Sequence, residues 1–494
     1  MDRAPIRFLL GNERREIAEI DPTMTVLNYL RLTEHLRGTK EGCAEGDCGA
    51  CTVVLAEPDG GKLRYRAVNS CIQFVPTLDG KQLITVEHLK DRAGGLHPCQ
   101  QAMVDCHGSQ CGFCTPGFVM SLFAMFHGAA SADRAGIEDA LAGNLCRCTG
   151  YGPIIDAAAR VRDLAARDQF DASEQATLEI LRGLQRRAGS SLAGDGRQYF
   201  APRTIRELAI LLEENPAATL LAGGTDVGLW VTKQHRRLAP IIYLGDIFEL
   251  KQVCEADGMI EVGAAVPYAD LHDRLGRHWP DFGELIRRLG SVQVRNAGTM
   301  GGNIANGSPI GDGPPALIAL GASLIMRKGA VRRELPLEAY FLDYGKQDRK
   351  PGEFVELIRI PSPDPAWQFR CYKVSKRFDQ DITACLGAFN ARLEGGKCQD
   401  IRICFGGMAA TPKRAAKAEA VLKGNSWSRA TVEQACVALS ADYRPIDDMR
   451  ASAAYRLRVA QNLLRKFFVE TTGPEVETRV IHAGKQAPME QVSG

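Results

Sequence analysis

The chain has 494 residues, of which 45% are hydrophobic and 24% charged, proportions that are typical of globular proteins. At roughly 150 residues per domain, this length predicts about three domains. The net charge of +2 does not favour nucleic acid as a partner, and no apolar run is as long as a membrane span. Because the first residues lack the charged and apolar segments of a secretory signal, we expect a cytoplasmic protein.

The first 84 residues predict a small α+β domain. Two strand-like runs flank Gly11-Asn12, a dipeptide typical of hairpin turns. A short helix and another strand follow, and Gly60-Gly61 ends that strand. The expected elements are strands at 6–10 and 13–17, a helix at 26–31 and a strand at 53–57.

Cysteine is concentrated in the first third of the chain. Of the 16 cysteines, ten fall between Cys43 and Cys148. In a cytosolic chain, clustered cysteines indicate metal binding more often than disulfides.

The first cysteine set follows the C-x4-C-x2-C…C spacing of plant-type [2Fe–2S] proteins. Three thiolates from one loop must converge on two irons, so the loop has to curl around the cluster. Glycines between the cysteines permit positive φ angles and a close approach of the backbone. Zinc is the alternative, although zinc sites usually show paired C-x2-C knuckles. The cysteines are Cys43, Cys48, Cys51 and Cys71, and the glycines are Gly42, Gly46 and Gly49.

Residues 85–166 predict an all-helical domain with a second cysteine set at the helix ends. An apolar helix is expected with Thr115 as its N-cap and Pro116 in its first turn. A second helix, at 137–144, should stop at Gly143-Asn144, and a third is expected at 154–166.

Each of these helix ends carries a cysteine pair, and two antiparallel helices would bring the pairs together. The spacing alone leaves zinc and [2Fe–2S] both open. The pairs are Cys111 with Cys114 and Cys146 with Cys148. We expect Cys99 and Cys106, which lie nearby, to be buried or half-buried thiols rather than ligands.

Glycine-rich loops mark the middle of the chain. Residues 167–197 carry scattered charges and are expected to be a linker, followed by a mixed domain at 198–375. Within that domain, 219–228 and 296–312 place glycine beside Thr, Asn and Ser, which can direct backbone N–H groups at a pyrophosphate. Neither loop has the G-x-G-x-x-G pattern, and a set of tight turns is the alternative.

The last domain, 376–472, should begin with strands and end with a helix at 449–468. The polar tail at 473–494 is expected to be disordered.

Two longer motifs, HGSQCGFCTPGFVMS (107–121) and GNLCRCTGY (143–151), resemble the signature of the molybdenum hydroxylase family. This family includes xanthine dehydrogenase, aldehyde oxidase and carbon monoxide dehydrogenase. The resemblance implies a β-grasp [2Fe–2S] ferredoxin domain, a helical-bundle [2Fe–2S] domain, an α+β FAD-binding domain and an α+β flavoprotein C-terminal domain. It assigns Cys43, Cys48, Cys51 and Cys71 to one cluster, and Cys111, Cys114, Cys146 and Cys148 to the cluster nearer the molybdenum.

The glycine loops resemble the two FAD-binding segments of this family. Leu289 stands where the family often has an aromatic residue for stacking on the flavin. With no histidine in the AGGTD loop (222–226), a non-covalently bound FAD is expected. The resemblance assigns FAD contacts to Thr219, Leu220, Leu221, Ala222, Gly223, Gly224, Thr225, Asp226, Gly298, Thr299, Gly301, Gly302, Asn303, Ser308 and Asp312, with Lys373 near the flavin ring.

No segment resembles the molybdenum-binding portion of the family, so no residue of this chain is expected to hydroxylate a substrate. The layout is similar to that of the small subunit of two-subunit bacterial xanthine dehydrogenases. That similarity implies a molybdopterin-binding large subunit, an (αβ)2 heterotetramer, and electron flow through both clusters to FAD and NAD⁺ while hypoxanthine and xanthine become urate. A related hydroxylase of aldehydes, nicotinate or other heterocycles, a free-standing redox sensor, and an autonomous NADH–acceptor reductase are the alternatives.

Overall fold

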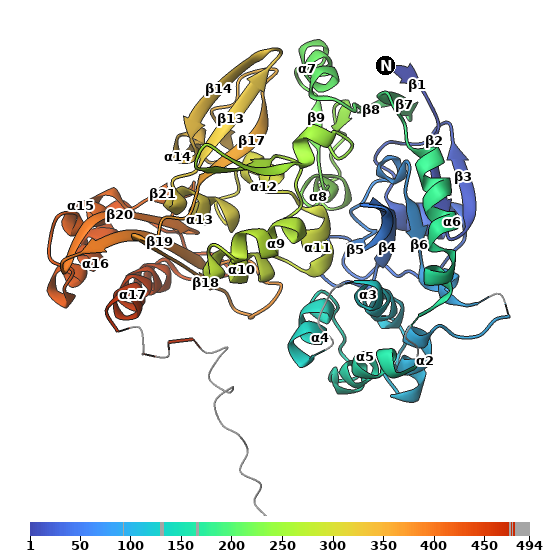
Figure 1. Ribbon diagram of the computed structural model, residues 1–494, viewed down its shortest axis with the longest axis horizontal. Helices are drawn as coiled ribbons and strands as arrows, with labels where there is room; N and C mark the ends of the chain where they lie inside the picture. The colour runs from blue at the N-terminus through green and yellow to red at the C-terminus, as the bar shows by residue number, and fades with distance from the viewer. Residues whose placement is uncertain (92, 129–132, 165–166, 474–475, 477, 480–494) are drawn as a thin grey trace, which may run out of the picture.

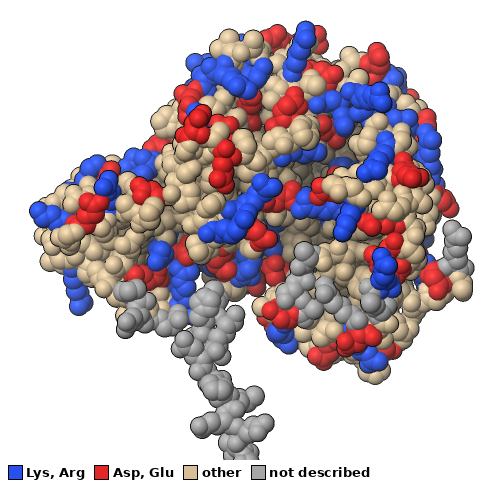
Figure 2. All heavy atoms as spheres, in the orientation of Figure 1, with Lys and Arg blue, Asp and Glu red and all other residues tan. Residues whose placement is uncertain are grey.

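The structure is a computed structural model that describes residues 1–494 except 92, 129–132, 165–166, 474–475, 477 and 480–494. Figure 1 shows the cluster-binding domains (blue to teal), the flavin domain (green to yellow) and the C-terminal domain (orange to red) side by side. Positive and negative side chains are interspersed over the face shown in Figure 2, in keeping with a net charge of +2.

The N-terminal domain is a β-grasp sheet with strand order β3-β2-β6-β4-β5. The predicted hairpin is confirmed, and β2 also pairs in parallel with β6. The predicted helix at 26–31 is a short α-helix, α1, continued by a π-helical turn at Tyr29–Thr33. The elements are β2 (Ile6–Leu10), β3 (Glu13–Ile17), α1 (Val26–Asn28), β4 (Thr52–Asp59), β5 (Lys62–Asn69) and β6 (Gln82–Ile84).

The second domain is helical, as expected, and α3 lies at its centre with Phe118 and Phe123 fully buried. The prediction that Thr115 caps this helix was wrong. Cys114 is the N-cap and Thr115 already has helical geometry, so no side chain caps the helix. The helices are α2 (Pro98–Asp105), α3 (Thr115–His127), α4 (Arg134–Leu141) and α5 (Gly152–Leu164), and the last two residues of the helix expected at 154–166 lie outside the described residues.

The segment expected to be a linker contains a helix, α6 (Gln169–Leu184), and the strand β7 (Ser190–Gly194). Leu178, Leu181 and Leu184 form one apolar stripe of α6 and pack against Leu9 and Leu63 of the β-grasp sheet. Glu179 and Arg182 lie on the exposed face of this amphipathic helix, whereas Glu174 accepts a hydrogen bond from the Leu63 N–H of the sheet at 2.9 Å. The segment is therefore part of the packed structure.

A buried carboxylate joins three helices of the cluster-binding domains. Asp168 caps α6, and its Oδ2 lies 2.7 Å from His97 Nε2 and 2.8 Å from His127 Nε2. Burial opposes ionisation of Asp168, but the hydrogen bonds from His127 and His97 outweigh it and hold the pKa of this carboxyl below its usual range. These hydrogen bonds fix α6 against α2 and α3.

The flavin domain contains two five-stranded sheets with helices between them and a two-stranded sheet, β15-β16. The first has the order β1-β7-β8-β10-β9 and includes the N-terminal strand, while the second has the order β11-β12-β17-β13-β14. The strands are β1 (Asp2–Arg3), β8 (Arg197–Ala201), β9 (Thr219–Leu221), β10 (Ile241–Tyr243), β11 (Val253–Ala256), β12 (Met259–Gly263), β13 (Ser323–Lys328), β14 (Val331–Pro336), β15 (Phe341–Asp343), β16 (Lys346–Gln347) and β17 (Phe354–Pro361). The helices are α7 (Ile205–Glu214), α8 (Val227–Thr232), α9 (Tyr268–Gly276), α10 (Pro280–Arg287), α11 (Val292–Ala297), α12 (Met300–Asn306), α13 (Gly313–Leu320) and α14 (Leu337–Tyr340).

One hydrophobic core extends from the β-grasp sheet into the flavin domain. Phe8 and Leu10 of β2 share this core with Tyr199, Leu221 and Tyr243 of the first flavin sheet. The two domains are thus packed together through apolar side chains, and the cluster-binding and flavin-binding regions form a continuous structure.

The C-terminal domain is a four-stranded sheet, β18-β19-β20-β21, with three helices. Lys373 lies in β18, so the domain boundary expected at 375 falls after the first strand of this sheet. The elements are β18 (Trp367–Val374), β19 (Cys385–Glu394), β20 (Lys397–Gly406), β21 (Lys413–Arg414), α15 (Ala416–Leu422), α16 (Arg429–Asp442) and α17 (Ala453–Thr472).

Most of the tail expected to be disordered lies outside the described residues, although the Arg479 guanidinium lies 2.7 Å from an oxygen of Asp281. Among the helices that the structure describes, none combines the length and hydrophobicity needed to cross a membrane.

Candidate functional site

The first cysteine loop curls around its own thiols. Gly46 and Gly49 have φ values of +79° and +68°, the left-handed conformation that glycine adopts without strain. The backbone N–H groups of Asp47 and Cys48 lie 3.4 and 3.3 Å from Cys43 Sγ, so they point toward the sulfur and can donate to it. Of the other three thiols of the set, that of Cys48 is half-buried, and those of Cys51 and Cys71 are buried. This loop has the enclosed, amide-lined form that a [2Fe–2S] cluster requires.

The second cysteine set lies at the surface of the helical domain. The sulfurs of Cys111 and Cys148 are 3.6 Å apart, and both residues are exposed. Cys114, at the start of α3, lies within hydrogen-bond reach of Cys146. The helix ends therefore bring the four thiols together as two pairs, as the sequence predicts.

Two neighbouring thiols have no part in either set. Cys99 is fully buried in the core of the helical domain, and Cys106 packs partly buried against the same core. Their position matches the expectation that they are not ligands.

The spacing of the thiols fits two irons better than one zinc. Four sulfurs bound to a single zinc at about 2.3 Å would lie roughly 3.8 Å from one another. Among the described residues, the group of three donor atoms that meets within 4.8 Å is His127, Asp168 and Asp171, so the thiols of both sets are spread more widely. In the second set, two pairs of thiols held apart match a cluster in which each iron takes two cysteines, whereas in the first set Cys43 and Cys71 each contact two other thiols.

The AGGTD loop connects β9 to α8 and leaves its backbone N–H groups free. Gly224 has φ +75°, and a side chain at Gly223 would overlap the carbonyl of Ala297. Within the described part of the chain, the N–H groups of residues 223–226 have no acceptor. A run of unpaired amides at a glycine turn is a feature that binds phosphate oxygens.

The second glycine loop packs directly against the first. Thr299 caps α12 by accepting from the Gly302 N–H at 3.0 Å, and Gly298 lies beside Thr225. The N–H groups of Met300 and Gly301 donate to the carbonyls of Val266 and Ala264. The first turn of α12 is therefore already satisfied, and the free amides belong to the AGGTD loop.

The other predicted flavin contacts lie around these loops. Asn303 accepts a hydrogen bond from the Tyr268 hydroxyl at 2.9 Å, and the Ser308 hydroxyl accepts from the Ile310 N–H. Leu289 is partly buried against the core of the flavin domain. The exposed ring of Phe378 lies in this region, with its centroid 4.3 Å from the guanidinium carbon of Arg288.

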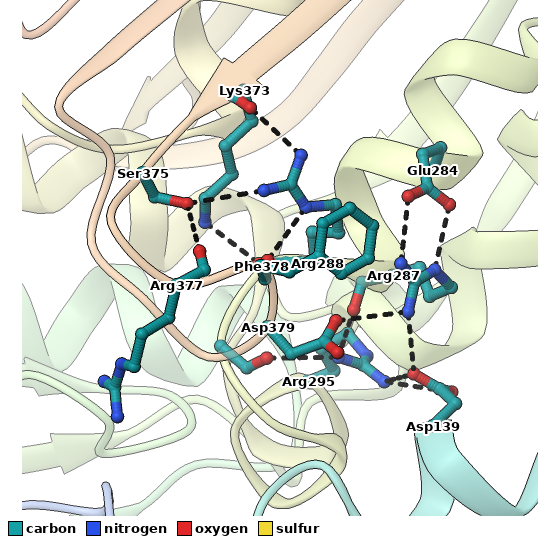
Figure 3. Close-up of polar contacts among 11 residues, drawn as sticks. Asp139, Glu284, Arg287, Arg288, Arg295, Lys373, Ser375, Arg377, Phe378 and Asp379 are labelled. Carbon is teal, nitrogen blue, oxygen red and sulfur yellow. Dashed lines mark hydrogen bonds and ion pairs between the residues drawn. The ribbon is translucent and has the colours of Figure 1, made fainter. Parts of the chain in front are cut away.

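Lys373 and Asp312 form a buried ion pair between the C-terminal and flavin domains. Lys373 Nζ lies 2.7 Å from Asp312 Oδ2 and 2.9 Å from the carbonyl of Arg288, and Thr383 also donates to Asp312. Figure 3 shows the Lys373 side chain reaching toward the Arg288 backbone while the Arg288 guanidinium contacts Lys373 O, Ser375 and Phe378 O. Two residues that the sequence assigned to the flavin are thus held in place by each other.

Several residues at this centre were missed by the sequence reasoning. Ile72 lies against Gly224 and Gly228 of the flavin domain. Its position directly after Cys71 is the feature of the sequence that could have indicated a role at the site. The Gln380 amide donates to the carbonyl of Asp47 in the first cysteine loop. Gln293 joins both cluster domains to α11, and no motif marks it.

A charged cavity of about 470 Å³ lies where β4 and β5 meet the flavin domain, beside the backbone of Gly223 and Thr299. Arg66 pairs with Asp270 across it at 2.8 Å, and Lys81 and Glu57 also line it. The contact between the two domains is therefore ionic at this cavity and apolar in the shared core described above.

Comparison with known proteins identifies all four domains. Residues 10–75 match the 2Fe-2S iron-sulfur cluster binding domain, and residues 85–159 match the [2Fe-2S] binding domain. Residues 193–363 match the FAD binding domain in molybdopterin dehydrogenase, and residues 370–471 match the CO dehydrogenase flavoprotein C-terminal domain. The four matches place the chain in the molybdenum hydroxylase family.

Relatives and solved structures agree with this placement. The chain is 31% identical to xanthine dehydrogenase of Emericella nidulans over 96% of its own length and 39% of the relative, and 32% identical to that of Drosophila pseudoobscura pseudoobscura over 99% and 40%. It therefore spans about two fifths of the length of these curated relatives. A carbon monoxide dehydrogenase structure from Hydrogenophaga pseudoflava is 28% identical with a TM-score of 0.52, covering 54% of this chain and 94% of that one.

The thiol sets and the unpaired loop amides therefore fit the cofactors of their matched domains, two [2Fe–2S] clusters and one FAD. The expected fold class is confirmed in all four parts.

Proposed function

We propose that the chain is the electron-transfer part of a xanthine dehydrogenase. Electrons from a molybdenum site on a large subunit would pass through two [2Fe–2S] clusters to FAD and then to NAD⁺. The sequence similarity to proteins named xanthine dehydrogenase supports the substrate, and the arrangement of the two cysteine sets supports the route.

The observation that carries the proposal is the difference in position between the two sets. In the helical set Cys111 and Cys148 are exposed, whereas in the first set Cys51 and Cys71 are buried and the neighbouring Ile72 lies against the AGGTD loop of the flavin domain. Substrate electrons would enter at the exposed set and leave at the flavin loops. In this assignment the ligands are Cys111, Cys114, Cys146 and Cys148 at the entry, then Cys43, Cys48, Cys51 and Cys71.

The surface around the exposed set suits a protein partner. Phe113, Leu145 and Tyr151 are 47, 37 and 36% exposed there, so apolar side chains surround the thiols. Apolar and aromatic side chains gathered at one place on a surface mark protein interfaces. We assign this surface to the molybdopterin-binding large subunit, in a cytoplasmic (αβ)2 assembly.

The chain's own residues have three tasks in this role. The cysteine loops hold the clusters, which when bound carry one electron each, and their amides donate to the sulfurs. The free amides of residues 223–226 hold the FAD pyrophosphate. Asp312 and Lys373 fix the wall of the flavin site between two domains.

A related hydroxylase is the second candidate. Solved structures of similar fold include carbon monoxide dehydrogenase and, at 22% identity and a TM-score of 0.51, quinoline 2-oxidoreductase from Pseudomonas putida 86. A free-standing redox sensor or an NADH–acceptor reductase would work without a molybdenum partner, which separates both from the leading proposal.

The deciding experiment is purification of the native chain with its partners. The expected result is a co-purifying chain with molybdenum, about four iron per chain in two EPR-distinct clusters, and xanthine-dependent NAD⁺ reduction. If the chain purifies without a partner chain and without molybdenum, the sensor or the reductase is favoured. Activity with another heterocycle or aldehyde but not xanthine would favour the second candidate.

A further inference from the structure

A buried polar junction joins the two cluster domains to the flavin domain. It consists of Gly49, Thr52, Ser121, Asn144 and Gln293. Gln293 and Asn144 are only 1 and 2% exposed, and Thr52 and Ser121 are similarly buried. Gln293 comes from α11 of the flavin domain, Thr52 from the β-grasp domain, and Asn144 and Ser121 from the helical domain.

The Gln293 amide is the centre of the junction. Its Nε2 lies 3.1 Å from Thr52 Oγ1, 3.2 Å from Ser121 Oγ and 3.2 Å from Asn144 Oδ1, so its N–H groups face acceptors in both cluster domains. Asn144 Nδ2 in turn donates to the carbonyl of Gly49 at 3.1 Å. One side chain thus bonds to both cluster domains at once.

The packing around the amide leaves no free space. A side-chain carbon added to Gly143 would overlap Gln293 Oε1, one added to Gly49 would overlap the Gly143 carbonyl, and one added to Gly117 would overlap the Gly49 carbonyl. Three glycines from two domains are therefore in backbone contact here. The Gln293 amide oxygen thus lies directly beside the Gly143 backbone.

The junction lies next to ligands of both clusters. Gly49 stands between Cys48 and Cys51, and Asn144 is two residues before Cys146. The Leu145 N–H donates to the carbonyl of Cys48 at 3.0 Å, which links the two ligand loops directly.

The same helix that carries Gln293 leads into the flavin loop at Thr299. Arg295 of α11 bonds to Asp139 of the helical domain at 3.0 and 3.2 Å, and Asn296 donates to the carbonyl of Ala67 in β5 at 2.9 Å. Helix α11 is therefore tied to both cluster domains just before it reaches the flavin loop.

We propose that Gln293 is a positioning residue for electron transfer, fixing the distance between the two clusters and between them and the flavin. This inference rests on the proposed electron-transfer function. Its Oε1 has no hydrogen-bond partner among the described residues, although it is buried. A buried unpaired carbonyl is unfavourable for stability, so the amide oxygen does not explain a glutamine here. Its two N–H donors, which an apolar residue lacks, do.

The test replaces Gln293 with Met, which keeps the length of the side chain and removes the donors. The matched control is Gln82→Met, because Gln82 is also 1% exposed, donates to the Gly11 carbonyl, and has an unpaired Oε1 away from the junction. Both variants and the wild-type chain, each holding iron and FAD, are reduced by a flash in the presence of a deazaflavin photoreductant. Redistribution of electrons among the cofactors is followed optically, and the magnetic interaction between the reduced clusters is measured by EPR.

Gln293→Met should slow redistribution by about tenfold or more, since small misplacements of reacting groups are costly, and should alter the EPR splitting. Gln82→Met should change neither. Wild-type rate and splitting in a fully loaded Gln293→Met chain would overturn the proposal. If that variant fails to retain its cofactors, Thr52→Val removes a partner of the same amide and is judged by the same two results.

The two proposals fail in different ways. If the wild-type chain holds both clusters and FAD but exchanges no electrons among them, the electron-transfer function itself is wrong. If the wild type exchanges electrons and the loaded junction variants match it, only the positioning role is wrong.

Discussion

The two cysteine sets differ in what surrounds them. Around the first set, contacts from the flavin and C-terminal domains include Gly228 against Ile72, the Thr232 hydroxyl donating to the Ala44 carbonyl at 2.7 Å, and Gln380 donating to Asp47. Around the second set, Cys111 and Cys148 are exposed. One set is thus enclosed by the parts that bind flavin, and the other is open to a partner. In the proposed relay, this difference sets the direction of electron flow.

The largest effect is expected from removing a ligand of the open set. Cys148→Ser should abolish or perturb the helical-domain cluster, because serine oxygen is a harder and poorer ligand for iron than thiolate. Xanthine-driven NAD⁺ reduction should fall by at least about 100-fold, since losing even outer partners of a metal site costs ~10–100-fold. NADH oxidation with an artificial acceptor at the flavin should persist.

Both activities are to be measured on one FAD-replete preparation assembled with its partner. Cys106→Ser is the control, because Cys106 lies in the same domain but packs against its core. Substrate-driven activity at the wild-type rate with the cluster demonstrably absent would contradict the direction of the relay.

The second effect concerns the enclosed side of the molecule. Asp312→Ala leaves the Lys373 ammonium buried without its carboxylate, and breaking such a pair costs about 3–5 kcal/mol. FAD occupancy and the unfolding temperature should both fall. The exposed Asp343→Ala should change neither. Wild-type FAD content and stability in Asp312→Ala would show that the pair does not support the flavin site.

A third variant inserts a methyl group between the enclosed cluster loop and the flavin domain. A side-chain carbon at Gly228 would lie 2.6 Å from the Ile72 carbonyl, so Gly228→Ala should cost about 1–3 kcal/mol through overpacking. The EPR signal of the first cluster should change while that of the helical cluster stays constant. Gly183→Ala, on α6 with open space around it, is the control. Equal changes in the EPR signals of both clusters would argue against the distinction between an enclosed first set and an open second set.

The smallest effect is a dependence of stability on pH. The pKa of Asp168 is held below its unfolded value of about 3.9 mainly by His127 and His97, against the opposing effect of burial. Its contribution is therefore present above that unfolded pKa and is lost as pH falls through the lower folded value. Asp168→Asn should be about 1–3 kcal/mol less stable at neutral pH, with a smaller difference from wild type in acid. A difference that does not change with pH would exclude this role.

Local features of this fold could be predicted from the sequence, whereas contacts between distant segments could not. The hairpin around Gly11-Asn12 and the two cysteine sets depend on turn chemistry and spacing, which a short stretch contains. The sequence predicts a linker at α6 because charged residues are scattered among Leu178, Leu181 and Leu184, which makes their three-residue spacing hard to recognise.

The candidate site shows the same limit. Its loops were found, but the pairing of Lys373 with Asp312 and the junction at Gln293 join residues from different domains. No sequence periodicity records such pairings, because they are set by how whole domains pack. The cap of α3 differs for a local reason. The sequence predicts the Thr115 hydroxyl as the cap, but the helix begins at Thr115, so the N-cap position is occupied by Cys114.

The central claim is that the enclosed set exchanges electrons with the flavin independently of the open set. The most direct measurement is flash reduction of the flavin in the Cys148→Ser chain, followed by the rate at which the remaining cluster becomes reduced. The account predicts exchange with the ferredoxin-domain cluster at the wild-type rate. Loss of that exchange, with the ferredoxin-domain cluster and FAD both present, would contradict it.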